Sequence, residues 1–507
     1  MKARFDCVVG IVASLALGCG DDEREPLGDG SGPSTAVDAS LDASLDARAR
    51  DAGGDGEAGD GGRLHDTRVF VVDERTLPFE ALPDAKVESD RYWGVLEGAG
   101  YQIEVPKQWN GMLVLYAHGY VGAVATLTVS PPGALRRHLI ERGYAWAASS
   151  YRANYYDVRA GVEDTNALAL AFTRLVAEGG RTVAEPSKRY VVGQAMGGHV
   201  AGAAIERETL ATAQHQVRYH AALSLCGAMG DLALFDYHAA YQAAAHTLTE
   251  TPMATSASAF GSVRMRLLDL LFAPYPTRNT PRGEQLQAIV AALSGGARPV
   301  FALGWASKSV EDALWFTSFG DDGTLAGIVA RPVTDTRAIT YQLDGDPALS
   351  AEEQALNARA IRVEGDRSAN DPRPGGLRHV PRLNGELEAP MLTLHTLGDL
   401  FVPFSMQQIY RERAEASGRG ERLVQRAIRA IGHCEFTRAE QASAFDALVR
   451  WERDGVVPSG DDVLDRSRLR QPDYGCRFTQ NTYAPEELAS GSTLPASRMR
   501  VPPCTLR

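Results

Sequence analysis

The stretch Tyr190-Val191-Val192-Gly193-Gln194-Ala195-Met196-Gly197-Gly198-His199 decides the fold of this chain. An apolar run ends at a glycine, and small or apolar residues at positions 200–205 then follow with helical spacing. This pattern predicts a buried strand that turns sharply into a helix. Glycines on both sides of position 195 would relieve crowding in the turn, so the side chain of residue 195 would project from it. Here that residue is alanine.

Buried-strand patterns and helical patterns alternate on both sides of this stretch. The helical spacing covers residues 135–140 and 168–176, and Gly179 and Gly180 end the second helix. Alternating strands and helices predict an α/β fold, with a mostly parallel sheet and helices on both faces. The expected buried strands are 112–117, 144–148, 189–192 and 221–226, and residues 67–72 and 101–105 alternate like antiparallel edge strands.

The alternation stops after Cys226 and resumes with the strand pattern at 391–395. Residues 227–385 contain helix-like segments at 235–245, 263–272 and 284–293, separated by Pro and Gly turns. We interpret this stretch as a mainly helical cap, inserted into a core formed by residues 65–226 and 386–455. The last segment, 456–507, is irregular and rich in proline, and we expect it to wrap around the core as a C-terminal extension.

Polar residues follow three further predicted strands. His118, Gly119 and Tyr120 come after the strand at 112–117, and Asp399 comes after the strand at 391–395. His433 follows a strand expected at 423–431, ahead of a helix that starts with a capping box from Thr437 to Glu440. Because the carboxyl ends of parallel strands meet at one edge of a sheet, these residues would lie near position 195.

Over residues 66–452 the chain resembles the α/β-hydrolases, which carry a nucleophile, an acid and a histidine in this order. The resemblance implies that position 195 is the nucleophile position, with Asp399 as the acid and His433 as the base. It also implies an oxyanion hole made by the backbone amides of Tyr120 and Met196. His118 and Gly119 would support that loop, and His199 would pack against the core. The implied reaction is hydrolysis of a carboxylic ester through an acyl-enzyme.

Ala195 has no hydroxyl group, so the sequence predicts a serine hydrolase scaffold without its nucleophile, either engineered or natural. Ser149, Ser150 and Cys226 do not occupy the turn, and we do not expect them to replace the missing group. Two alternatives stay open: a non-catalytic binding protein at the cell surface, and a peptidase or amidase of the same fold. The partner would be a small or polymeric ester, and no cofactor or metal is expected, since no CxxC or HExxH motif occurs.

The first residues resemble a bacterial lipoprotein signal, with Lys2 and Arg4 ahead of a short apolar run that ends at Cys19. The resemblance implies a signal peptide at 1–18, lipidation of Cys19, and anchoring in the bacterial envelope, in the outer membrane because Gly20 follows. Residues 19–64 form an expected disordered acidic tether. Twelve acidic residues and three arginines lie between 20 and 62, so most of the formal charge of −12 falls there. The mildly acidic remainder does not indicate a nucleic-acid partner.

Six cysteines are present, and Cys7 and Cys19 fall in the signal segment. In an oxidising compartment the other four suggest two disulfides, with three possible connectivities. We favour Cys226 with Cys434, because both follow strands at the same edge, and Cys476 with Cys504 within the extension. Tannases and feruloyl esterases also have a cysteine beside the catalytic histidine, but it pairs with a cysteine just before the nucleophile. Gln194 stands there in this chain, so substrates of that subfamily are not transferred.

Overall fold

The computed structural model describes residues 68–254, 256–307, 325, 328–329, 331–372, 376–489 and 492–504. The expected signal peptide, Cys19 and the tether lie outside the described residues. One compact unit covers Asp66–Arg507. Among the helices of the described ranges, none combines the length and apolar character needed to span a bilayer.

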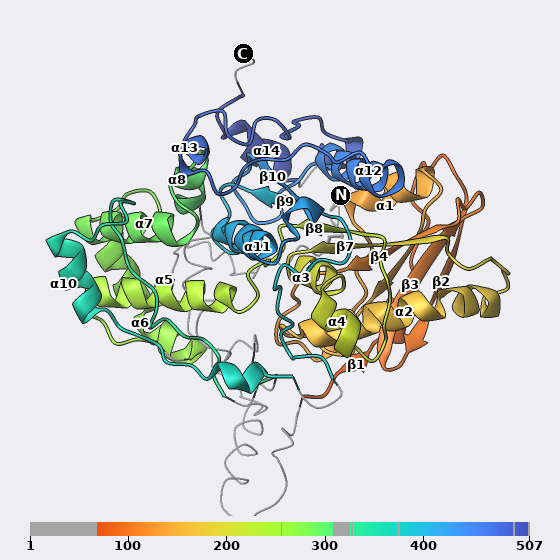
Figure 1. Ribbon diagram of the computed structural model, residues 1–507, viewed down its shortest axis with the longest axis horizontal. Coiled ribbons are helices and arrows are strands. Elements are labelled where there is room, and N and C mark those ends of the chain that lie inside the picture. Colours follow the sequence, from red (N-terminus) through yellow and green to blue (C-terminus); the bar gives the residue numbers. More distant parts are fainter. Residues whose placement is uncertain are drawn as a thin grey trace, which may run out of the picture. The chain divides into compact units, whose positions relative to one another are not determined.

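An eight-stranded sheet forms the centre of this unit, in the order β10-β9-β8-β7-β4-β6-β3-β2 (Figure 1). Neighbouring strands from β10 to β6 pair in parallel, whereas β6, β3 and β2 pair antiparallel. The strands are β2 (Ser89–Leu96), β3 (Ala99–Pro106), β4 (Met112–Ala117), β6 (Ala145–Ser149), β7 (Lys188–Gln194), β8 (Ala221–Leu225), β9 (Met391–Thr396) and β10 (Leu423–Ile428).

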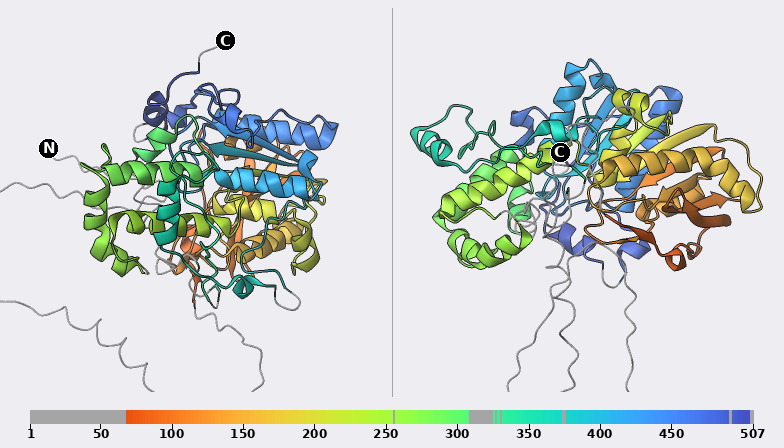
Figure 2. Two further views of the ribbon diagram at one scale, coloured as in Figure 1. Left: turned by 60° about the vertical axis from the view of Figure 1, so that its left-hand side comes forward. Right: turned by 90° about the horizontal axis from the view of Figure 1, so that it is seen from below.

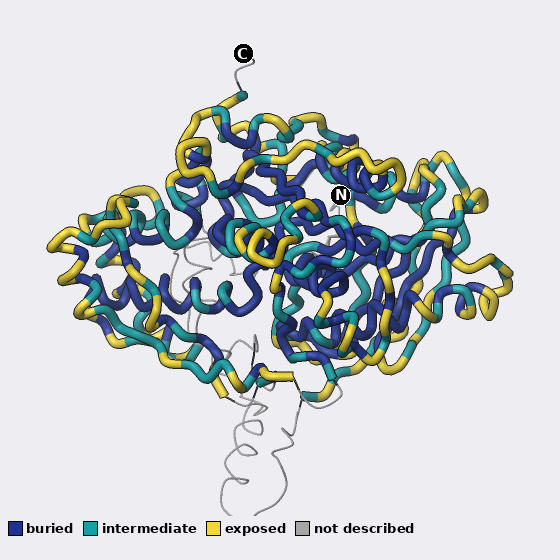
Figure 3. Tube along the Cα trace, in the orientation of Figure 1, coloured by how far each residue is buried: buried dark blue, intermediate teal, exposed yellow. Residues whose placement is uncertain are grey.

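Helices cover both faces of the sheet, as the alternating pattern predicts. In β4, Leu113 and Leu115 face one hydrophobic core, and Val114 and Tyr116 face the other. This alternation with a period of two residues explains why the strand reads as a continuous apolar run. The first core packs against α2 (Val158–Glu178), α3 (Met196–Ala203) and α11 (Ser405–Ala416), and the second against α1 (Ala134–Glu141) and α12 (Arg438–Asp454). Figure 3 shows the buried chain concentrated along these layers.

Neither expected edge strand lies at the edge of the main sheet: 101–105 belongs to β3, which pairs antiparallel as expected but lies between β6 and β2. Within the segment 67–72, the described strand is only β1 (Val71–Val72), and Thr67 lies outside the described residues. β1 pairs in parallel with β5 (Thr126–Leu127) in a separate two-stranded sheet. The antiparallel edge of the main sheet is β2, which joins β3 through a tight hairpin at Glu97 and Gly98 with positive φ angles of 49° and 86°. The local hairpin outcompetes a long-range pairing because its loop closure costs little entropy.

The stretch between β8 and β9 is mainly helical in the described residues. Its helices gather to one side of the sheet in the views of Figures 1 and 2. They are α5 (Ala233–Thr249), α6 (Ala257–Leu271), α7 (Pro281–Leu293), α8 (Phe301–Trp305) and α10 (Ala351–Arg359), and a short α4 (Arg207–Thr212) precedes β8. We call residues 227–385 the cap.

The C-terminal segment covers the outer edge of β10, the last strand of the sheet. Asp461 donates its backbone N–H to the Gln425 carbonyl at 2.7 Å, and its Oδ2 accepts the N–H of Ala427 at 2.8 Å. These bonds satisfy an edge strand that would otherwise present unpaired backbone groups. Short helices α13 (Arg466–Leu469) and α14 (Leu494–Met499) complete the segment. From α14, Arg498 makes a fully buried ion pair with Glu440 at 2.7 Å.

Candidate active site

The turn between β7 and α3 holds Ala195 with φ 54° and ψ −119°. A positive φ is uncommon for a residue with a side chain, and such a conformation costs of order 1–3 kcal/mol. The Ala195 N–H donates to the Leu225 carbonyl at 2.9 Å, which fixes the turn against β8. A Cβ at Gly193 would collide with the Gly197 carbonyl, and one at Gly197 would collide with the Ala117 carbonyl. The two glycines therefore permit the close approach that the strained turn requires.

His433 and Asp399, which follow β10 and β9, form a short hydrogen bond. The His433 Nδ1 lies 2.6 Å from Asp399 Oδ2, and the Asp399 side chain is 1% exposed. The other carboxylate oxygen accepts the N–H groups of Phe401 and Val402 at 2.9 and 3.0 Å. Burial alone raises the pKa of Asp399, but His433 and the backbone amide lower it below its ordinary value overall. The carboxylate is therefore ionised and can orient the imidazole.

The far nitrogen of the imidazole is left available. His433 Nε2 is buried and has no hydrogen-bond partner in the described part of the chain. The Phe401 ring packs on the His433 ring, with centroids 5.4 Å apart. A histidine with Nδ1 held by a carboxylate and Nε2 open can accept a proton from a nucleophile.

The segment His118-Gly119-Tyr120 lies directly against the turn. A Cβ added to Gly119 would sit 3.3 Å from the Ala195 Cβ. His118 is buried, stacks on Tyr151 with a centroid distance of 4.0 Å, and places its ring nitrogens 2.7 and 3.2 Å from the carbonyls of Gly119 and Ser150. Burial lowers the pKa of His118, so the ring is neutral and donates a hydrogen bond to one of these two carbonyls.

Met196 is the first residue of α3, and Ala195 is its N-cap. The first amides of a helix have no intrahelical acceptor, so the Met196 N–H belongs to the groups that can bind an anion at the helix start. Tyr120 follows Gly119 in the loop that touches Ala195. His199, one turn into α3, is fully buried and packs as expected, with Nε2 2.7 Å from the Pro381 carbonyl.

The other candidate nucleophiles are occupied. Ser149 Oγ accepts the Tyr151 N–H at 3.0 Å. Ser150 Oγ donates to the Tyr151 carbonyl and accepts the Gly100 N–H. Cys226 is in a disulfide. None of these groups lies at the turn that holds Ala195.

Sequence reasoning missed a buried polar chain behind Asp399. His395, on β9, lies with Nε2 2.8 Å from the Val402 carbonyl and 4.0 Å from Asp399 Oδ2. Gln407 Nε2 donates to His395 Nδ1 at 3.1 Å, so Nε2 of this histidine carries the proton. Burial lowers the pKa of His395 to about 4 and keeps it neutral. The sequence carries no signal for this contact, because His395 reads there as one more position of a buried strand.

The cap contacts the loop that carries Asp399. Arg298 donates through Nε to the Leu397 carbonyl at 2.7 Å, and the Tyr237 hydroxyl donates to the Leu400 carbonyl at 3.1 Å. Gly304 of α8 approaches Gly398 so closely that a Cβ would overlap its carbonyl. Burial lowers the pKa of Arg298 to about 10, which leaves it cationic at neutral pH. The cap therefore helps to fix the acid's position.

Two disulfides join the four cysteines in the pairing that the sequence favours: Cys226 with Cys434 and Cys476 with Cys504. The first ties the end of β8 to the residue after His433. A sulfur of each of these cysteines lies within 4.8 Å of a His433 ring nitrogen. The same three residues form a candidate metal-ligand group in the described ranges, but both sulfurs are bonded to each other and are not free thiolates.

The first bridge is expected to stabilise the chain more than the second, because it closes a loop of 208 residues rather than 28. Replacing Cys226 and Cys434 together with alanine should lower the free energy of unfolding by about 2–5 kcal/mol, measured by urea denaturation. The matched control replaces Cys476 and Cys504. An equal or larger loss in the control would contradict this ranking.

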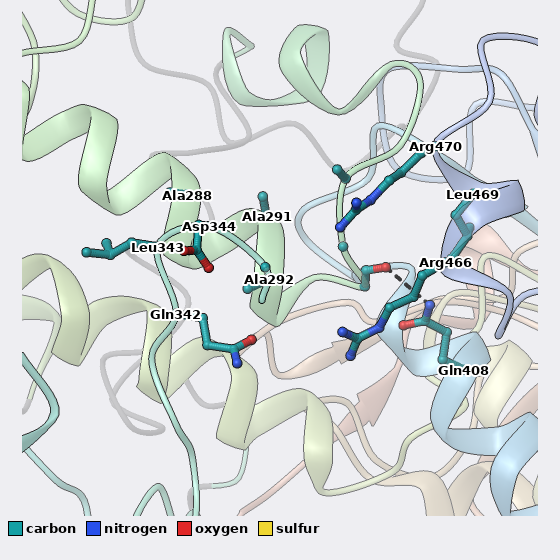
Figure 4. Close-up of a pocket in the computed structure, with 14 residues that line it drawn as sticks. Ala288, Ala291, Ala292, Gln342, Leu343, Asp344, Gln408, Arg466, Leu469 and Arg470 are labelled. Atoms are coloured by element: carbon teal, nitrogen blue, oxygen red, sulfur yellow. Dashed lines mark hydrogen bonds between the residues drawn. The ribbon is translucent and has the colours of Figure 1, made fainter. Parts of the chain in front are cut away.

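A surface pocket lies apart from these residues, between α7, the loop 342–345 and α13. Figure 4 shows Arg466 and Arg470 extending toward it, with Gln342 and Asp344 on the other side. Gln408 Nε2 donates to the Gly295 carbonyl at its floor. Its lining does not include Ala195, Asp399 or His433.

An α/β-hydrolase scaffold is defined by three features of this structure. They are the strand order, the strained turn after β7, and the acid and histidine that follow β9 and β10. The sequence matches no protein-family model. A stretch of 75 residues is 31% identical to o-phthalyl amidase from Xanthobacter agilis, and it covers 15% of this chain and 17% of the amidase. The chain thus aligns with only a small part of that relative's length.

Several solved structures are similar to this chain at low sequence identity. Feruloyl esterase B from Aspergillus oryzae is 13% identical, with a TM-score of 0.39 over 74% of this chain and 82% of that chain. An acylaminoacyl peptidase from Pyrococcus horikoshii is 12% identical, with a TM-score of 0.35. The match covers 75% of this chain and 43% of the peptidase. Brefeldin A esterase, described as a bacterial homologue of human hormone sensitive lipase, is 12% identical, with a TM-score of 0.35. The match covers 78% of this chain and 82% of the esterase.

Proposed function

We propose that this chain is a carboxylic-ester hydrolase scaffold whose nucleophile is missing at Ala195. The observation that carries the proposal is the bond of 2.6 Å between His433 Nδ1 and Asp399 Oδ2, with Nε2 of the same ring open. A histidine held in this way serves as a general base for a hydroxyl. The position from which a hydroxyl would project is the strained turn at Ala195.

With a serine at position 195, Oγ would attack the ester carbonyl while His433 Nε2 takes its proton. The amides of Tyr120 and Met196 would stabilise the oxyanion, each contributing on the order of 3 kcal/mol. His433 would then protonate the leaving alcohol, leaving an acyl group on the serine. Water, deprotonated by His433, would release the acid and restore the hydroxyl. With alanine there is no oxygen to attack, so the site binds an intact ester and does not cleave it.

The test of this proposal is to restore the hydroxyl with Ala195→Ser and to assay ester and amide panels beside the unmodified chain. Cleavage of esters by Ala195→Ser alone supports the esterase assignment. Cleavage of amides or peptides in preference to esters would replace it with the amidase or peptidase alternative. Tight binding of a ligand by the unmodified chain, with no cleavage of any substrate by Ala195→Ser, would favour a surface binding protein.

We also propose that the protein is exported and anchored to the bacterial envelope through lipid on Cys19. The lipoprotein-like start of the sequence and two disulfides in the folded unit support this. In cells fed an alkyne-tagged fatty acid, the full-length chain should become labelled in the membrane fraction. Cys19→Ser should abolish the labelling, and equal labelling of both proteins would contradict the anchor.

A further inference from the structure

Helix α5 of the cap is buried along almost its whole length and carries three polar side chains in a row. His238, Gln242 and His246 recur every four residues, so their side chains lie on one stripe of the helix. Their exposed fractions are 1%, 0% and 0%. Much of the rest of the helix is alanine, and the Tyr237 hydroxyl is paired with the Leu400 carbonyl.

The amide of Gln242 is unsatisfied. Neither its Oε1 nor its Nε2 has a hydrogen-bond partner in the described structure, and His246 Nε2 also lacks one. His246 Nδ1 lies 2.7 Å from the Thr251 hydroxyl, so Nε2 is the ring nitrogen that lacks a partner. A buried polar group without a partner destabilises a protein, and such groups are rare in native folds. A carboxamide at this position therefore needs a reason other than stability.

His238, at the start of the stripe, and the proposed catalytic His433 contact the same ring, that of Phe401. The His238 ring lies 5.7 Å from the Phe401 ring, and Phe401 lies 5.4 Å from the His433 ring. The neighbouring Tyr237 hydroxyl bonds to the Leu400 carbonyl, which fixes this end of α5 against the same loop. Gln242 and His246 follow at intervals of about one helical turn, roughly 5–6 Å each. Gln242 and His246 thus lie about one and two helical turns beyond His238 along α5.

The chemistry of the stripe favours an uncharged ligand. Burial lowers the pKa of His246 to about 4, so its ring is neutral at pH 7. Gln242 is neutral and offers one acceptor and two donor hydrogens. A charged group buried beside these neutral side chains would lose its hydration and would be disfavoured. An amide group, which also presents one acceptor beside one donor, is complementary to Gln242.

We propose that Gln242, assisted by His246, forms a subsite that binds an uncharged amide group in the acyl arm of the substrate. This deepens the proposed function and rests on it, because the stripe is placed relative to His433. Gln242 here determines specificity and takes no part in bond making or breaking.

The test uses p-nitrophenyl esters of straight-chain acids, each compared with analogues in which one amide replaces two methylenes at successive positions. In the Ala195→Ser chain, the best amide analogue should be preferred by kcat/KM. Gln242→Leu should lower that preference by about three- to tenfold, the effect of losing one or two hydrogen bonds. The same substitution should not lower the Tm, because it removes an unsatisfied buried amide. Gln242→Met, closer in shape, serves as a second variant.

The control is Gln354→Leu, which alters an exposed glutamine on α10 of the same cap. Isothermal titration of the uncleavable Ala195 chain with the same esters gives a readout that does not depend on catalysis. If the Ala195→Ser chain cleaves no ester, the proposed function fails, and titration still decides the subsite. An unchanged preference with Gln242→Leu, an equal change with Gln354→Leu, or a lowered Tm in both Gln242 variants would overturn the inference.

Discussion

Replacing Ala195 with serine is expected to raise kcat for ester hydrolysis by about 10⁴-fold or more over the unmodified chain. Removing the serine of a complete triad costs factors of this size or greater in serine hydrolases, so restoring it should recover a comparable gain. The turn that would present the hydroxyl is already formed at φ 54°, and Gly193 and Gly197 leave it the space it needs. Initial rates on p-nitrophenyl acetate and butyrate measure the effect.

The matched control is Ala195→Gly, which relieves the positive φ without adding a nucleophile. It should stay as inactive as the unmodified chain. Equal hydrolysis by all three proteins would show that the reaction takes place elsewhere, and it would contradict the assignment of position 195.

The second large effect concerns the acid and the base. In the Ala195→Ser chain, His433→Ala and Asp399→Asn should each lower kcat by about 10⁴-fold. His433→Ala removes the proton acceptor. Asp399→Asn replaces an oxygen that now lies 2.6 Å from His433 Nδ1, so the ring would lose the group that fixes its tautomer and stabilises its protonated form. Steady-state kinetics measure both losses, and circular dichroism verifies folding.

A second histidine–carboxylate pair supplies the control. His138 of α1 lies with Nε2 2.8 Å from Asp446 Oδ1 of α12, and both helices pack on the sheet face opposite to α3. In the Ala195→Ser chain, adding His138→Ala should change kcat by no more than about threefold. This is usual for partly exposed positions away from a reacting centre. Activity that survives His433→Ala would refute the role of His433 as the base.

Much of this site can be predicted from the sequence because each part is encoded locally. The apolar run and glycines around Ala195 specify a strand and a sharp turn, and Asp399 and His433 follow recognisable buried strands. Parallel pairing of β7 to β10 then brings the strand ends to one edge. The capping box at Thr437 and Glu440 is also present as expected.

Other parts depend on contacts between distant segments and have no local signature. The hydrogen bonds from Gln407 to His395 and from His395 to the Val402 carbonyl join a helix, a strand and a loop. In sequence, His395 reads only as one more position of a buried strand. Both expected edge strands differ from the structure because short alternating segments look alike in sequence, and the pairing of β2 with β3 decides which strand lies at the edge. The unsatisfied amide of Gln242 becomes visible only when its burial is known.

The most direct measurement is covalent labelling of the Ala195→Ser chain with a fluorophosphonate, followed by mass mapping of the labelled peptide. The reagent forms a stable adduct only with a serine that is activated by a base and faces oxyanion donors. We predict one adduct per chain, on the serine introduced at position 195, with none on the unmodified chain and almost none after His433→Ala. Absence of labelling in a folded Ala195→Ser chain, or an adduct on a different residue, would contradict the claim that this site lacks only a serine hydroxyl.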